Sequence, residues 1–354
     1  MEAFIRSTGN ISPQHITEQG KFPDAVNEYE TVSMNCIEPD YKEYLNPINA
    51  RRMGRIIKMG VAAAKMCLKD TGVDVPDAII TGTGLGCIED TEKFLIAILE
   101  NDERLLPPTS FIQSTHNTVS AQIALDLKCN NYNYTYVHRA LSFETALLDA
   151  LMMFAEKDAK NILLGAADEI TQNSIAIFSR LGLLKRKALK NTDLYNTPTK
   201  GSIAGEGATF FLLSDEYQQG DLAKVRGVST FFDPDGSILI NSEILGFLDE
   251  HDLSRNDIDL VLYGYNGDSE FDGVYDKVKN SIFKNISAAR YKHLCGEYFT
   301  SSAFAMWLAA TILNNNTIPD DVLTDKSSPK QLNNIVIYNQ FRNTEHSIML
   351  LSKC

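Results

Sequence analysis

The side chains of this sequence that could attack a carbonyl group are few. Ser142 and His138 lie close together near the start of a predicted helix, and these are two residue types of a serine acyl-transfer site. No carboxylate is obviously placed to orient His138, and a serine at a helix start is usually a cap. Cys295 lies two residues from Glu297, but we expect this thiol to be buried and inert. Acyl transfer or hydrolysis by Ser142 or Cys295 is therefore kept as an alternative.

Nucleotide and metal chemistry are disfavoured. Residues 82–86 read Gly-Thr-Gly-Leu-Gly, which lacks the spacing of a dinucleotide loop and has no basic residue to meet phosphate. The six histidines show no metal-ligand spacing, and the six cysteines form no Cys-x-x-Cys pair. The sequence predicts no cofactor and no metal, and its thiols are those of a reduced, cytoplasmic protein.

Composition excludes several classes of partner. The chain has 354 residues, 33 Lys and Arg against 46 Asp and Glu, and a net charge of −13. Such a surface repels nucleic acid and anionic lipid. No apolar run approaches the roughly eighteen residues of a spanning helix, and the first residues lack a signal-peptide pattern. We expect a soluble cytoplasmic protein.

An acidic protein partner would need a local basic patch. Two runs of basic residues could supply one. They are Arg51, Arg52, Arg55 and Lys58, and Lys185, Arg186, Lys187 and Lys190.

Short apolar runs alternate with amphipathic stretches, which is typical of an α/β fold. The pattern of strand, helix and strand occurs once before about Asp215 and once after it. We therefore predict two similar α/β halves, residues 1–215 and 216–354. Strands are predicted at 78–82, 133–137, 161–165, 208–213, 223–229, 260–264, 334–338 and 347–351, and helices at 54–69, 120–127, 141–154, 240–250 and 301–313.

The order of these segments resembles the β-ketoacyl-acyl-carrier-protein synthases, the condensing enzymes of fatty-acid and polyketide assembly. The most specific match is Ala204-Gly205-Glu206-Gly207-Ala208, which is similar to the family's Gly-Glu-Gly-Ala motif. Residues 79–86 look like its first strand and glycine turn, and 111–124 look like the helix after its Pro-Asn motif. Residues 165–168 stand for its Gly-Gly-x-Glu strand end. The resemblance implies a thiolase-like fold, with the two halves packed as layers α-β-α-β-α.

The family's nucleophile is a cysteine at a strand-to-helix turn, where helix amides stabilise the thiolate. Counting back without gaps from residues 165–168 places Ala140 at this position. A methyl group cannot form a thioester. A slip of one residue would give Arg139, which cannot form one either.

The family's two histidines are also replaced. Asn266 stands where the resemblance implies the first; an amide can donate a hydrogen bond but cannot shuttle a proton near neutral pH. Its alternative role is to close the turn after the strand. Lys292 to Glu297 fits the motif Lys-x-x-x-Gly-His, with Lys292 retained and Glu297 in place of the histidine. A carboxylate there would repel a malonyl carboxylate. Residues 341–345 lack the family's glycine-rich closing turn.

These four departures predict that the chain has no catalytic residues of its own. The resemblance implies a chain-length-factor-like subunit that pairs with an active β-ketoacyl synthase, shapes its acyl tunnel and works with an acyl-carrier protein. Residues 4–14 and 136–139 look like the variant associated with aryl-polyene pigment clusters. The alternative is a stand-alone homodimer that binds an acyl chain or an aromatic ligand without chemistry.

The same resemblance implies where the partner binds. The strand at 133–137 is expected to pair across a two-fold-like interface, with residues 107–121 beside it. Gln113, Thr115 and His116 are therefore candidates for the tunnel or its interface, although capping or plain packing would also explain each of them.

Overall fold

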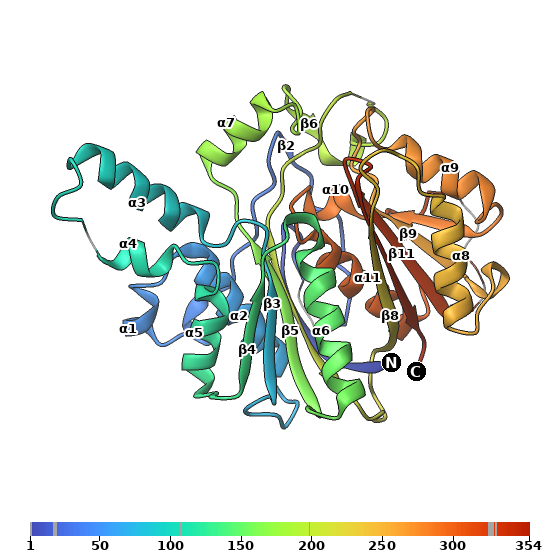
Figure 1. Cartoon of the computed structure of the whole chain (residues 1–354), viewed down its shortest axis with the longest axis horizontal. Helices are drawn as coiled ribbons and strands as arrows, with labels where there is room; N and C mark the ends of the chain where they lie inside the picture. Colours follow the sequence, from blue (N-terminus) through green and yellow to red (C-terminus); the bar gives the residue numbers. More distant parts are fainter. Residues whose placement is uncertain (1, 17–19, 107, 198, 325–328, 330) are drawn as a thin grey trace.

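The structure is a computed structural model that describes residues 2–16, 20–106, 108–197, 199–324, 329 and 331–354 (Figure 1). The large sheet contains β1 (Ala3–Ile11), β3 (Ala78–Gly82), β4 (Tyr132–Tyr136), β5 (Asn161–Asp168), β7 (Gly207–Ser214), β8 (Ala223–Phe232), β9 (Leu260–Tyr263), β10 (Ser287–Arg290), β11 (Asn334–Phe341) and β12 (Glu345–Ser352). The helices are α1 (Pro47–Ala50), α2 (Arg55–Leu68), α3 (Ile88–Glu100), α4 (Pro108–Gln113), α5 (Thr118–Leu127), α6 (Ser142–Glu156), α7 (Gln172–Arg180), α8 (Ile240–Glu250), α9 (Gly273–Ser281), α10 (Lys292–Cys295) and α11 (Ser301–Asn315). A separate small sheet pairs β2 (Glu30–Thr31) with β6 (Leu189–Lys190).

The ten strands lie in the order β10-β9-β11-β12-β8-β1-β7-β5-β3-β4, so each half contributes five strands in the same internal order. In the N-terminal half β3 runs parallel to β4 and β5, and in the C-terminal half β9 runs parallel to β10 and β11. A short antiparallel pairing of β1 with β8 joins the two halves. The predicted boundary at residue 215 lies in the segment between β7 and β8.

Each half-sheet is apolar on both faces, which produces three cores. Ile79 faces the core beneath α2 and α5, while the next residue, Ile80, faces the core around α6 and α11. In the other half Val336 faces the core under α8 and α9, while Ile337 faces α11. Because strand side chains alternate between faces, this pattern places α6 and α11 between the half-sheets (Figure 1). The predicted layered, thiolase-like α/β fold is confirmed.

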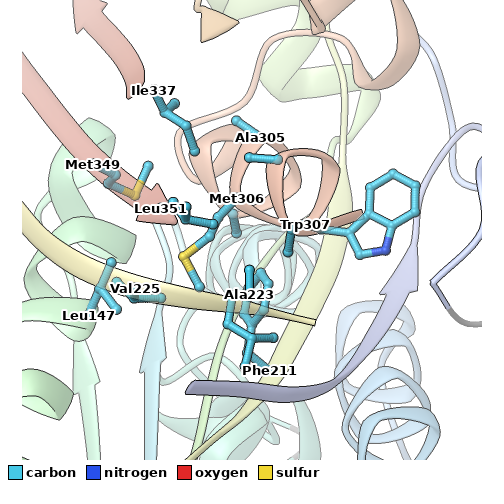
Figure 2. Packing of buried hydrophobic residues seen from close by; sticks show 14 of the residues in the cluster. Leu147, Phe211, Ala223, Val225, Ala305, Met306, Trp307, Ile337, Met349 and Leu351 are labelled. Carbon is cyan, nitrogen blue, oxygen red and sulfur yellow. The ribbon is translucent and has the colours of Figure 1, made fainter. Parts of the chain in front are cut away.

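Helix α11 is the centre of this packing. All of its residues from Ser301 to Leu313 are buried, and a helix that is apolar all round belongs inside a protein. Figure 2 shows Met306 and Trp307 of α11 with Phe211 of β7 and Met349 of β12 in the same core. The middle helix therefore contacts both half-sheets.

Several elements differ from the prediction. Helices α3, α7 and α9 and strands β1 and β10 were not predicted, and β4 begins one residue earlier than expected. Among the described residues, no helix is both long enough and apolar enough to cross a membrane.

We expect Trp307→Ala to lower the free energy of unfolding by about 3–5 kcal/mol, because it removes a large, buried side chain from the central core and leaves a cavity. Phe232→Ala removes an aromatic ring that is 62% exposed on β8, and should cost less than about 1 kcal/mol. Denaturant unfolding of both variants measures the difference. Equal losses would contradict the central role of α11.

Candidate functional site

The predicted nucleophile turn lies between β4 and α6. A short 3-10 turn covers Arg139–Leu141, and α6 begins at Ser142. Ala140 is buried, whereas Arg139 is exposed and has a φ of 48°. The turn packs against β12, whose Ser347 donates a hydrogen bond to Glu144 of α6.

The hydroxyl of Ser142 is fully occupied by the backbone. It accepts a hydrogen bond from the His138 N–H at 2.8 Å and lies 2.9 Å and 2.8 Å from the carbonyl oxygens of Thr83 and Arg139. The residue has no exposed surface. These contacts hold the start of α6 against the end of β3, so Ser142 has a structural role and no access to an acyl group.

The structure brings Asn266, Glu297 and Lys292 together. The Asn266 Nδ2 amide donates to Glu297 Oε2 at 2.7 Å, and Lys292 Nζ lies 2.6 Å from the same oxygen. Asn266 also closes its turn, because its Oδ1 accepts from the Asp268 N–H at 3.0 Å. The Lys292 side chain is only 1% exposed, so this ion pair is largely shielded from water. Glu297 thus neutralises a buried ammonium group.

Two further carboxyl groups surround this ion pair. Burial raises the pKa of Glu144 to about 7, although Lys292 and a hydrogen bond from Ser347 at 2.9 Å oppose the rise. Burial likewise raises the pKa of Asp272 to about 7. Asp272 accepts from the backbone N–H groups of Asn266 and Gly267 at 3.1 and 2.8 Å. The site is therefore a cluster of carboxyl groups around one buried lysine.

A small apolar cavity adjoins the cluster. Its volume is about 60 Å³, and Glu297 lies on its wall with Leu85 and the aromatic rings of Phe178, Phe299 and Phe341.

Cys295 is buried, as expected. Its Sγ lies 3.3 Å from the Gly296 carbonyl oxygen, and burial raises the pKa of its thiol well above the usual range. Because the thiolate is the reactive form of cysteine, this residue is a poor nucleophile.

The closing turn joins β11 to β12 without a glycine. Three residues, 342–344, connect the strands, and the first two, Arg342 and Asn343, both have a φ of 56°, which is left-handed backbone. The Asn343 N–H donates to Gln340 Oε1 at 2.7 Å, and the Thr344 N–H donates to the Phe341 carbonyl at 3.1 Å. Both amides are therefore already used and cannot serve an oxyanion.

The three tunnel candidates lie at the surface of the chain. Gln113 accepts from the Gly54 N–H at 3.1 Å and donates to the Arg52 carbonyl, so it holds the end of α4 to the start of α2. Thr115 is exposed, and its hydroxyl is 2.9 Å from that of Thr118 in the first turn of α5. His116 is exposed beside the glycine turn after β3. None of them lines the cavity.

Sequence reasoning missed Glu144 and Asp272, and it missed that Asp168 accepts hydrogen bonds from both Gly84 and Thr300. Charged residues at buried helix and strand ends are a usable signal, but their partners lie far away in sequence. The part of the chain that the structure describes contains no group of three His, Cys, Asp or Glu residues that could hold a metal ion.

Comparison with known proteins supports the predicted resemblance. Residues 27–179 match the family model described as beta-ketoacyl synthase, N-terminal domain. The 3-oxoacyl-[acyl-carrier-protein] synthase 2 of Vibrio cholerae serotype O1 is 23% identical over 218 residues, which cover 59% of this chain and 49% of that protein. The enzyme of the same name from Staphylococcus aureus strain N315 is 22% identical over 204 residues, 54% of this chain and 47% of its own. The chain thus matches about half the length of these relatives.

Solved structures show the same fold over the whole chain. The ishigamide ketosynthase/chain length factor has a TM-score of 0.81 and 17% identity, covering 100% of this chain and 99% of its own. The ketosynthase (ApeO) in complex with its chain length factor (ApeC) from Xenorhabdus doucetiae gives 0.77 at 15% identity, covering 99% and 98%. Both comparisons establish the ketosynthase fold.

The buried carboxyl groups generate a pH prediction. The pKa of Glu144 is about 4.5 in the unfolded chain and about 7 in the folded protein. Between pH 4.5 and pH 7 the folded protein therefore holds a proton that the unfolded chain has lost. The free energy of unfolding consequently falls as pH rises through this range. Glu144→Gln should flatten this dependence and stabilise the protein by about 1–3 kcal/mol at pH 8. Unfolding curves from pH 5 to 8 measure it, with the exposed Glu250→Gln as control. An unchanged slope in Glu144→Gln would contradict the assignment.

Ala140→Cys alone is expected to produce no condensing activity. The new thiol would still lack a proton-transfer partner, because Asn266 cannot shuttle a proton and Glu297 is held by Lys292. Product formation from acyl and malonyl thioesters, measured by mass spectrometry, tests this. A measurable condensing rate would show that the site has been misassigned.

Proposed function

Since this chain is related to the β-ketoacyl synthases and has their fold, we propose that it is a non-catalytic, chain-length-factor-like subunit. It pairs with an active β-ketoacyl synthase and shapes the acyl tunnel of that partner. In this proposal, Ala140, Asn266 and Glu297 occupy the positions of the reactive cysteine and the two histidines of a condensing enzyme, and Lys292 is retained.

The observation that carries this proposal is the ion pair between Lys292 and Glu297. A condensing site must leave room for a malonyl group and supply donors to its thioester carbonyl. Here the buried ammonium and the Asn266 amide are both directed to one oxygen of Glu297. With a methyl group at Ala140, the site is stable and self-neutralised but has no reactive group.

The exposed edge of the sheet supports a protein partner. Strand β4 is the last strand of the sheet, and Tyr132 and Tyr134 on it are 42% and 49% exposed. Their rings stack 6.2 Å apart, and Leu148 and Met152 of the neighbouring helix α6 are exposed too. An open edge with an aromatic face is a template for pairing with another chain. We assign this surface to the synthase, with Thr115 and His116 next to it.

The structural relatives support the same context. They include ketosynthase and chain length factor proteins and a type II polyketide synthase acyl-carrier protein in complex with its ketosynthase. We propose an acyl-carrier protein as the second partner and polyketide or aryl-polyene assembly as the pathway class. The alternative is a stand-alone homodimer that binds an acyl or aromatic ligand, for which the apolar cavity lined by Phe178, Phe299 and Phe341 is the candidate site.

Co-expression with a β-ketoacyl synthase that retains its reactive residues tests the pairing. The expected result is a 1:1 complex on size exclusion. Tyr134→Asp should disrupt it, because it buries a charge in the interface, whereas Tyr217→Asp, which is 55% exposed on a loop far from β4, should not. Self-association alone, with no synthase bound, would refute the heterodimer.

Enlarging Thr115 tests the tunnel role. We expect Thr115→Trp to shorten the product of the partner synthase, because the larger side chain would enter the space for the growing chain. Product length is read by mass spectrometry, and the exposed Leu239→Trp serves as a control. Unchanged products from an intact complex would count against the role of Thr115.

A further inference from the structure

A pocket of about 350 Å³ lies at the carboxyl ends of the parallel strands β9 and β10, beside the start of α9 (Figure 1). Ligands of α/β sheets bind outside the carboxyl ends of parallel strands, and a pocket of this size can hold a small molecule. Of the residues that the structure describes, none lines both this pocket and the apolar cavity beside Glu297. The pocket is therefore a separate place in which a ligand could bind.

The cation of the pocket is the guanidinium of Arg290, the last residue of β10. It lies 4.1 Å from the centroid of the Tyr195 ring and 5.9 Å from the centroid of the Tyr265 ring. Arg290 is half-buried, and the described part of the chain offers its side chain no hydrogen bond and no ion pair. The rings hold the guanidinium in place but leave its N–H donors unused. A guanidinium in this state is suited to bind a carboxylate with two parallel hydrogen bonds.

Three aspartates line the same pocket. Asp276 is exposed, and its Oδ1 accepts a hydrogen bond from the Tyr265 hydroxyl at 2.7 Å. Asp268 is buried, and its Oδ1 accepts from the Glu270 N–H at 2.9 Å. Burial raises the pKa of Asp272 to about 7, so this carboxyl group carries only part of its charge near neutral pH. The residues that line the pocket therefore carry more negative than positive charge.

These charges select the kind of ligand. A carboxylate or a phosphate alone would be attracted by Arg290 but repelled by the aspartates. An amine alone would be attracted by the aspartates but would leave the guanidinium donors unused. A ligand that carries both a carboxylate and an ammonium group satisfies both sets of residues, and each contact is a charge-assisted hydrogen bond.

We propose that this pocket binds a zwitterionic amino acid. The carboxylate of the ligand lies against the guanidinium of Arg290, and its ammonium group lies against the carboxylates of Asp276 and Asp268. The proposal does not depend on the role of the chain as a synthase partner, because neither Ala140 nor Glu297 lines the pocket.

The test is saturation-transfer NMR of the full chain with each of the standard L-amino acids. The dissociation constant of the amino acid that binds most tightly is then measured by titration. The carboxamide and the N-acetyl derivative of this amino acid each lack one of the two charges. Each should bind about tenfold or more weakly, because it loses one charge-assisted contact.

Two variants remove the two halves of the pocket. Arg290→Gln removes the guanidinium, and Asp276→Asn removes the exposed carboxylate but keeps an acceptor for the Tyr265 hydroxyl. Each should weaken binding of the same amino acid about tenfold or more. Arg255→Gln and Asp158→Asn make the same changes of charge at exposed positions outside the pocket, and should change the affinity less than about twofold.

The outcomes decide for or against the proposal. If Arg290→Gln does not fold, Asp276→Asn decides, because Asp276 lies at the surface. Equal binding of the amino acid and its N-acetyl derivative would show a plain anion site and refute the proposal. Binding of no amino acid, or wild-type affinity in Asp276→Asn, would refute it too. Failure of the chain to pair with a synthase would refute the proposed function and leave this pocket unaffected.

Discussion

The carboxylate of Asp168 is the interaction on which the arrangement of the site depends. It lies at the end of β5 and accepts hydrogen bonds from the Thr83 hydroxyl at 3.0 Å and from the backbone N–H groups of Gly84 and Leu85 at 2.8 and 3.4 Å. Its second oxygen accepts from the N–H and hydroxyl of Thr300 at 3.1 and 2.8 Å, just before α11. One buried carboxylate therefore fixes the glycine turn of the first half to the central helix of the second. Removing it would leave several buried donors without acceptors, which is costly.

The two halves meet at the candidate site because of this constraint. Gly205 lies so close to the Cys295 carbonyl that a Cβ would approach it to 2.0 Å, and its N–H donates to the Glu297 carbonyl. The Gly-Glu-Gly-Ala motif thus packs directly on the loop that carries Glu297. This close contact gives a physical reason for a glycine at position 205, because a side chain there would push away the loop that carries Glu297.

The sequence predicted the parts of the fold that local pattern determines. Buried strands with continuous apolar runs and helices such as 240–250, with a clear period, were placed almost correctly. Helix α3 was missed because only Asp90 of it is buried, so it has no core face to read. Strand β1 was missed because Ser7, Thr8 and Asn10 interrupt its apolar pattern, although Ser7 is buried through a hydrogen bond to the Cys67 carbonyl. The residues of the candidate site were proposed by resemblance, whereas the ion pair between Lys292 and Glu297 is visible only in the structure.

On the proposed function, the buried Lys292 needs a counter-ion of its own, because the chain has no reactive groups around it. A buried ammonium without a counter-ion destabilises a protein by several kcal/mol, so Lys292 could persist only with a carboxylate nearby. Glu297 supplies that charge from the position where a condensing enzyme would need a neutral donor, and the Asn266 amide satisfies the same oxygen. If Asn266 and Glu297 replace reactive residues, as we propose, the two replacements depend on each other, because Asn266 and Lys292 both donate to the same oxygen of Glu297. The ion pair therefore stabilises the loop that carries Glu297, where the two halves meet. Under the proposed function, this chain contributes a binding surface to its partner and no reactive group.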